Sequence, residues 1–272
     1  MRTIMPPSRQ RFAAAMAALG ITGLANGDFE LAWQEIPLHH LPGYTVIAYV
    51  CAVIELAAGI GLLFNATLKL TCRVLFPYMM LWVLLLEIPI AIHSPQDPGA
   101  WGSVGEIAIV TAGAWCLFAV QAGPWRHMSI AGGSSGVRAA RCLLIVALPM
   151  IGIEVIADAA HFGNAVMPPW LQGLPDPARW AELSGLGSLA AGLGLLFGVW
   201  PRLAAAMEAT MLGIITVVYW GPDLYTGRTA ITAFIISFLI TAGAWLIADT
   251  YHGVPWFATR RPVWSDRTEG AA

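Results

Sequence analysis

Six ionisable side chains stand out because long apolar stretches of the chain surround them. They are Glu55, Glu87, Glu106, Glu154, Asp158 and His161. Carboxyl and imidazole groups are costly to place in lipid, so each is a candidate for a proton relay or for contact with a ligand. The same side chains could instead satisfy structural contacts between helices, and the pattern leaves both interpretations open.

Glu154, Asp158 and His161 follow one another at i, i+4 and i+7, which predicts one face of a helix near its outer end. A histidine beside two carboxylates suits a proton relay or a divalent metal. A metal would need further ligands from another helix, and the chain contains no H-E-x-x-H or C-x-x-C spacing. These three are the candidate metal ligands, but the sequence favours neither a bound metal nor haem.

Glu55 is the first choice for a single functional side chain, because it falls near the middle of its apolar stretch. A carboxyl at that depth is expected to be protonated unless it is paired, since removal from water disfavours the charged form. A protonated Glu55 could donate a hydrogen bond to a quinone carbonyl or pass on a proton. A quinone is therefore the cofactor that this chemistry would suit.

Eight stretches are long and apolar enough to position these residues as spanning helices. They run near 11–27, 45–66, 70–92, 104–123, 139–161, 180–199, 203–220 and 229–249. Of the 272 residues, 58% are hydrophobic and 11% are charged, whereas about a quarter are charged in soluble domains. The composition predicts an all-α polytopic membrane protein that contacts the lipid bilayer. A net charge of −2 excludes a nucleic-acid binder that works through a basic face.

The basic residues predict the orientation of these helices. If the eight stretches all span, twelve of the 14 Lys and Arg residues fall on one side, which by the positive-inside rule is the cytoplasm. Both termini are then cytoplasmic, and the protein belongs in the cell's inner membrane. On the outer side, Trp33, His39 and His40 fall in a segment that we interpret as an interfacial helix or a loop anchored by tryptophan.

The two halves of the chain align when one is shifted by 133 residues. Residues 56–64 (LAAGIGLLF) fall on 189–197 (LAAGLGLLF), and Lys69 falls on Arg202. Pairs of glycine within these two segments are expected to let backbones approach closely. We predict two parallel four-helix units in tandem. The divisions are an N-terminal segment 1–10, a first unit 11–123, a linker 124–138, a second unit 139–250 and a tail 251–272.

Three motifs resemble the DoxX-like family of membrane proteins. They are the segment 27–34 (GDFELAWQ), the Leu41-Pro42-Gly43 turn and the segment 58–63 (AGIGLL). That family is built on a four-helix unit, so the resemblance implies two such units over about residues 11–250. The family includes membrane subunits linked to quinone-coupled sulfur oxidation and other redox accessory proteins. The resemblance therefore implies a redox accessory role, and it carries over no set of catalytic residues.

Three classes of function remain open. The first is a membrane subunit or accessory protein of an electron-transfer system, which rests mostly on the resemblance. The second is a proton-coupled transporter of small molecules or ions, with the buried acids as relay groups. The third is a structural subunit that packs against a larger membrane complex. The chain has no G-x-G-x-x-G fingerprint after a strand and no C-x-x-C-H haem attachment, so enzymatic activity is left open.

Overall fold

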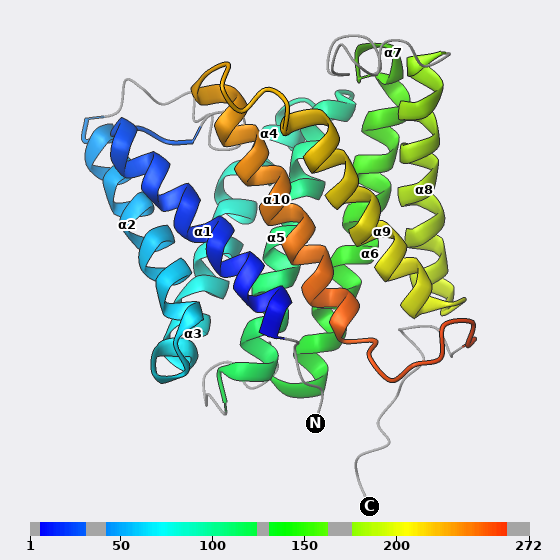
Figure 1. Ribbon diagram of the computed structural model, residues 1–272, viewed down its shortest axis with the longest axis horizontal. Helices are drawn as coiled ribbons and strands as arrows, with labels where there is room; N and C mark the ends of the chain where they lie inside the picture. Colours follow the sequence, from blue (N-terminus) through cyan, green and yellow to red (C-terminus); the bar gives the residue numbers. More distant parts are fainter. Residues whose placement is uncertain (1–5, 31–41, 124–130, 163–175, 260–272) are drawn as a thin grey trace, which may run out of the picture.

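The computed structural model describes residues 6–30, 42–123, 131–162 and 176–259, and helices joined by short turns make up most of these ranges (Figure 1). The long helices are α1 (Pro6–Asn26), α2 (Tyr44–Leu63), α3 (Asn65–Trp82), α5 (Pro98–Gln121), α6 (Gly133–Ala157), α8 (Pro177–Phe197), α9 (Pro201–Ile215) and α10 (Arg228–Asp249). Shorter pieces are the π-helical turns η1 (Val83–Glu87) and η5 (Thr216–Trp220), and the helices α4 (Ile88–His93) and α7 (Ala159–His161).

Seven helical stretches in the described ranges are long and apolar enough to cross a bilayer. They are α2, the continuous stretch from α3 to α4, α5, α6, α8, the stretch from α9 to η5, and α10. Helix α1 has the required length but is not among them, because Arg9, Gln10 and Arg11 make its first turns polar. The expected all-helical class is thus confirmed, and the seven apolar helices are compatible with the expected multi-pass membrane protein.

The helices pack in a closed order, and two members of that order also meet across its middle. Each of α1, α2, α3, α5, α6, α8 and α9 packs on the next, and α10 completes the ring by packing on both α9 and α1. In the middle, α5 packs on α10 (Figure 1). Helix α1 packs on α2 as α6 packs on α8, and α5 packs on α6 as α10 packs on α1.

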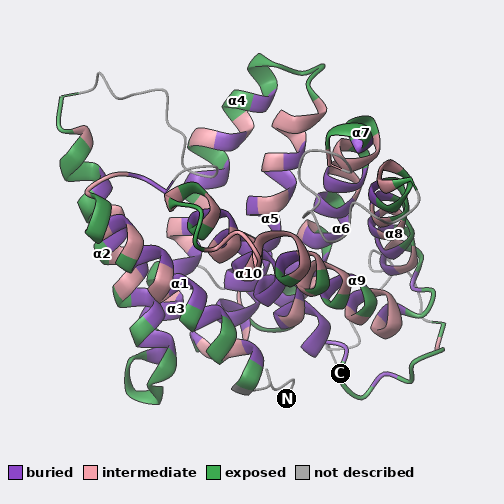
Figure 2. Ribbon diagram, turned by 45° about the horizontal axis from the view of Figure 1, so that its top comes forward, coloured by how far each residue is buried: buried purple, intermediate pink, exposed green. Residues whose placement is uncertain are grey.

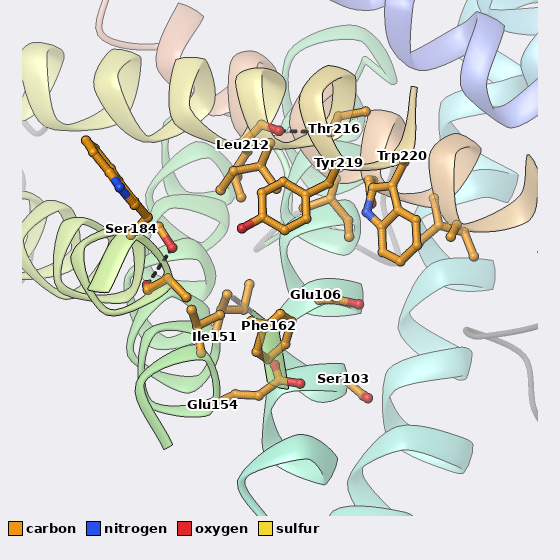
Figure 3. Close-up of a pocket in the computed structure, with 18 residues that line it drawn as sticks. Ser103, Glu106, Ile151, Glu154, Phe162, Ser184, Leu212, Thr216, Tyr219 and Trp220 are labelled. Carbon is orange, nitrogen blue, oxygen red and sulfur yellow. Dashed lines mark hydrogen bonds between the residues drawn. The ribbon is translucent and has the colours of Figure 1, made fainter. Parts of the chain in front are cut away.

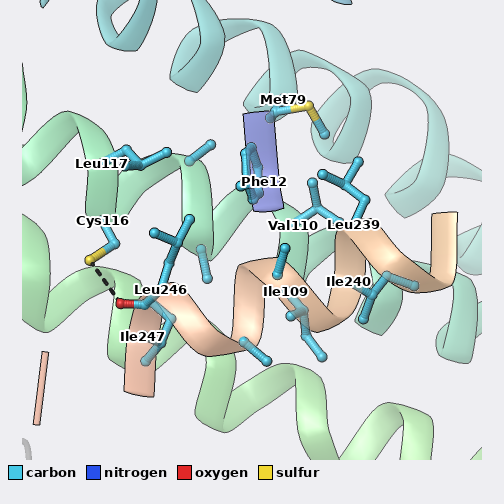
Figure 4. Close-up of a cluster of buried hydrophobic side chains, with 14 of the residues drawn as sticks. Phe12, Met79, Ile109, Val110, Cys116, Leu117, Leu239, Ile240, Leu246 and Ile247 are labelled. Carbon is cyan, nitrogen blue, oxygen red and sulfur yellow. Dashed lines mark hydrogen bonds between the residues drawn. The ribbon is translucent and has the colours of Figure 1, made fainter. Parts of the chain in front are cut away.

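Small residues set the closest helix contacts, as expected where lipid provides no hydrophobic drive for association. At the centre, a Cβ atom on Gly113 of α5 would lie 2.7 Å from the Cα atom of Gly243 on α10. The two glycines fall in matching TAGAW segments, 111–115 and 241–245, which align when a three-residue deletion is added to the 133-residue shift. Large buried side chains surround the crossing, among them Phe12, Met79 and Leu239 (Figure 4).

The outward faces of the peripheral helices are apolar. Figure 2 shows exposed residues recurring along α2 and α8, and the exposed side chains there include Val46, Val50, Val53, Leu183, Leu186 and Leu193. Apolar surface of this extent marks contact with a membrane or a partner. The polar groups, by contrast, concentrate inside the bundle and at its two ends. This arrangement supports lipid as the surrounding solvent.

Candidate functional site

A cavity of about 460 Å³ opens between α5, α6, α8, η5 and α10 (Figure 3). It lies toward the end of the bundle opposite the start of α1 and the end of α10. Its polar lining residues are Ser103, Glu106, Glu154, Trp180, Ser184, Thr216, Tyr219, Trp220 and Ser237. The remaining wall is mostly aliphatic, with one further ring from Phe162. A concave, largely apolar site with a few converging polar groups is the usual form of a small-molecule pocket.

Two acids that the sequence singled out meet in this cavity. Glu106 comes from α5 and Glu154 from α6, and both carboxyl groups lie on the same side of it (Figure 3). Neither has a hydrogen-bond or ion-pair partner in the described part of the chain. Gly102 makes this arrangement possible, because a Cβ atom there would overlap Glu154 Oε2. A small residue on α5 thus provides the space that an acid on α6 occupies.

Further acids surround the pair. Glu87 of η1 is close enough to Glu106 to repel its charge, and Asp97 and Asp158 act on Glu154 in the same way. The segments 74–125 and 142–178 contain neither Lys nor Arg, and their two histidines, His93 and His161, do not line the cavity. The electrostatic environment of the cavity is therefore negative whenever these groups ionise.

Aromatic side chains form the opposite wall. Tyr219 and Trp220 project from η5 across the cavity from the two carboxyl groups (Figure 3). The π-helical turn that carries them is held by Thr216, whose hydroxyl donates to Leu212 O at 2.8 Å and lies 3.1 Å from Thr241 Oγ1. Turns of this kind are frequent at functional sites, because they re-aim side chains relative to a regular helix.

The structure separates the other predicted acids from this cavity. Glu55 is 1% exposed and accepts a hydrogen bond of 2.7 Å from Tyr78 on α3, so it links α2 to α3 and does not line the cavity. Glu87 is buried beside the cavity, and its effect on Glu106 is the repulsion between their charges. Trp33, His39 and His40 lie outside the described residues.

The prediction that Glu154, Asp158 and His161 lie on one face of a continuous helix is wrong. Helix α6 ends at Ala157, and Asp158 adopts φ −117° and ψ 32°, which breaks the helical spacing before α7 begins. Asp158 and His161 are exposed, whereas Glu154 faces the cavity. No group of three His, Cys, Asp or Glu side chains within the described ranges is arranged to hold a metal ion.

Sequence reasoning missed Glu208, which is 2% exposed on α9. Ser188 on α8 donates a hydrogen bond of 2.9 Å to Glu208 Oε1, and the carboxyl borders a second cavity of about 620 Å³ between α8 and α9. The sequence could have indicated Glu208 as a buried acid, because it lies within the apolar stretch 203–220. Glu55 on α2 and Glu208 on α9 thus have similar structural roles, because each links two neighbouring helices by a hydrogen bond.

An ion pair fastens α1 to α10 at the same end of the bundle as the cavity. Arg228 Nη1 lies 3.3 Å from Asp28 Oδ2, and its Nη2 donates to Phe29 O at 2.7 Å. Burial alone would raise the pKa of Asp28, but hydrogen bonds from Tyr44 and from the Phe29 N–H oppose it. Together with the hydrogen bond and charge of Arg228 they hold the pKa below its ordinary value of 3.8.

Stability should therefore depend on pH through Asp28. A folded-state pKa below the unfolded one stabilises the fold above the unfolded value, and this contribution is lost as the pH falls below about 4. We expect Arg228→Met to lower the free energy of unfolding by about 1 kcal/mol at neutral pH. Thermal unfolding of both proteins from pH 7 to pH 3 should show the difference shrinking in acid. A constant difference would contradict the assignment to Asp28.

Comparison of the chain with family models, curated proteins and solved structures finds no match. The candidate site therefore rests on the geometry of the cavity and on the sequence itself.

Proposed function

We propose that the chain crosses the inner membrane eight times, as two tandem four-helix units with both termini in the cytoplasm. Helix α1 supplies the eighth crossing, because it is 21 residues long and lies packed between α2 and α10. The tandem arrangement is supported by the equivalent helix contacts of the two halves and by the meeting of Gly113 with Gly243. The basic residues at the first turns of α1, α3, α6 and α9 support the orientation.

We propose that the cavity binds a small lipophilic molecule and that Glu106 and Glu154 exchange protons when it binds. The observation that carries this function is the meeting of two carboxyl groups, one from each half, in one aromatic-lined cavity without a counter-charge. Such groups must be neutral or must be balanced by what enters the cavity, because an isolated charge is costly in an apolar setting. Binding and protonation at this site are therefore linked.

Two of the functional classes are compatible with this site. In proton-coupled transport, the carboxyl groups would release or take up protons as the ligand enters and leaves. In a redox accessory protein of the DoxX-like kind, protonated Glu106 and Glu154 would donate hydrogen bonds to the carbonyl oxygens of a quinone lying against Tyr219 and Trp220. The aromatic rings of Tyr219 and Trp220 opposite two hydrogen-bonding groups support the second role, whereas the missing counter-charge supports the first. The exposed α8 and α9 would be available to a larger complex in either case.

A hydrophobic carbodiimide tests whether these carboxyl groups are protonated and reachable from the membrane. The reagent attacks protonated carboxyl groups in apolar surroundings and leaves a stable adduct that peptide mass spectrometry locates. We expect modification of Glu106 or Glu154 in the protein in lipid nanodiscs, and its decline as the pH rises. Glu106→Gln and Glu154→Gln should each remove the adduct at the changed position while the thermal unfolding midpoint is kept.

Glu182→Gln is the matched control, since Glu182 is exposed on α8 at the same end of the bundle. It should leave the modification of the cavity unchanged. Modification of Glu208 without any at Glu106 or Glu154 would show that lipophiles reach the α8–α9 cavity only, and would contradict the proposed site.

A further inference from the structure

The cavity is surrounded by acids from several elements and by few cations. Glu87 approaches from η1, Asp97 from the turn before α5, and Asp158 from the end of α6. Of the basic residues at this end, Arg179 is paired with Asp176 at 2.6 Å and Arg228 with Asp28. The two basic side chains are thus committed elsewhere, and neither lines the cavity.

The neutral part of the lining also fits a positively charged guest. Trp180, Tyr219 and Trp220 present aromatic rings to the cavity, and the face of such a ring attracts a cation. Tyr219 is also the titratable group that η5 contributes, whereas α8 and α10 contribute the hydroxyls of Ser184 and Ser237. None of these groups supplies a positive charge to Glu106 or Glu154.

We propose that the ligand of this cavity is a lipophilic organic monocation, such as a quaternary ammonium, a phosphonium or a protonated amine with apolar substituents. The inference rests on the proposed function, in which the cavity binds a lipophile and exchanges protons. A hydrated metal ion fits less well, because most of the wall is apolar and the described side chains bring no three metal ligands together. An organic cation matches both the aliphatic and aromatic wall and the acids.

Binding is balanced in charge by the loss of a proton. The O–H bond of Glu106 or Glu154 breaks, the proton passes to water, and the carboxylate left behind pairs with the cation. The second carboxyl keeps its proton, because a second negative charge so near the first would be unfavourable. About one proton should therefore leave for each cation that binds.

The test uses the full chain in lipid nanodiscs with tetraphenylphosphonium as the cationic probe and ubiquinone-1 as a neutral ring dicarbonyl. Quenching of tryptophan fluorescence reports binding, and a pH indicator in weak buffer reports protons. We expect tetraphenylphosphonium to bind with release of about one proton and with higher affinity at higher pH. Empty nanodiscs measure partition of each probe into lipid.

Glu106→Gln and Glu154→Gln together should weaken tetraphenylphosphonium binding at least about 30-fold and abolish proton release, because the buried charge partner is removed. Glu182→Gln should bind as the unchanged protein does. The inference would be overturned if the double variant bound tetraphenylphosphonium as tightly as the unchanged protein does, or if the unchanged protein bound it without releasing a proton. If ubiquinone-1 binds and tetraphenylphosphonium does not, the cation inference is overturned and the proposed function stands. If neither probe binds and the carbodiimide modifies neither carboxyl group, both the cation inference and the proposed function are overturned.

Discussion

Replacing Gly59 by alanine is expected to destabilise the protein by about 3 kcal/mol, whereas the same change at Gly192 should be neutral or slightly stabilising. The two glycines are 133 residues apart and occupy the same place in LAAG segments that are otherwise closely alike. A Cβ atom on Gly59 would overlap the backbone nitrogen of Ala17 and lie 2.7 Å from Ala13 O. Backbone atoms cannot move aside as a side chain can, so α1 and α2 would separate.

Gly192 faces a looser contact. A Cβ atom there would lie 3.5 Å from Leu148 Cβ, which is an ordinary van der Waals distance. Alanine also favours the helix over glycine by up to about 1 kcal/mol. Thermal unfolding midpoints of Gly59→Ala and Gly192→Ala, measured side by side in the same detergent, check the pair. An equal fall in the unfolding midpoint of both variants would contradict the prediction, because it would show that α8 packs on α6 at Gly192 as tightly as α2 packs on α1 at Gly59.

This difference shows how far the sequence alone could predict the packing. The LAAG segments correctly indicated helices with small faces, but their similarity made Gly59 and Gly192 look equivalent. In the second half the closest approach lies at Gly152 and Gly185, where a Cβ atom on either would lie 2.7 Å from the carbonyl oxygen of the other. The first half is tight both at that level, where Gly20 meets Ala52, and at Gly59. Which glycine carries a crossing depends on the partner helix, and an isolated segment does not contain that information.

The site shows the same division between local and distant information. Hydropathy was enough to select Glu106 and Glu154 as acids in apolar helices, because the cost of such groups is a local property. Their meeting in one cavity depends on the contact between α5 and α6, helices that the sequence assigned to different units. The end of α6 at Ala157 was also hidden, because the apolar residues on both sides of Asp158 continue the helical pattern.

Gly102→Ala is expected to weaken ligand binding in the cavity about as much as Glu154→Gln does, with little change in stability. A Cβ atom on Gly102 would overlap the carboxyl group of Glu154. The obstacle is the far end of a flexible side chain, which can turn to another rotamer at a cost of about 1 kcal/mol. The carboxyl would then leave its position in the cavity while the contact between α5 and α6 is kept.

Gly99→Ala is the matched control on the same helix. A Cβ atom there would lie 3.9 Å from Glu154 Oε1 and 3.3 Å from Asp97 Oδ1, so Glu154 keeps its position. Carbodiimide modification at residue 154 should therefore change in Gly102→Ala and persist in Gly99→Ala, with thermal unfolding midpoints within a few degrees of the unchanged protein. If Gly102→Ala left that modification intact, Glu154 would not need the space above α5, and the cavity would have to work through Glu106 alone.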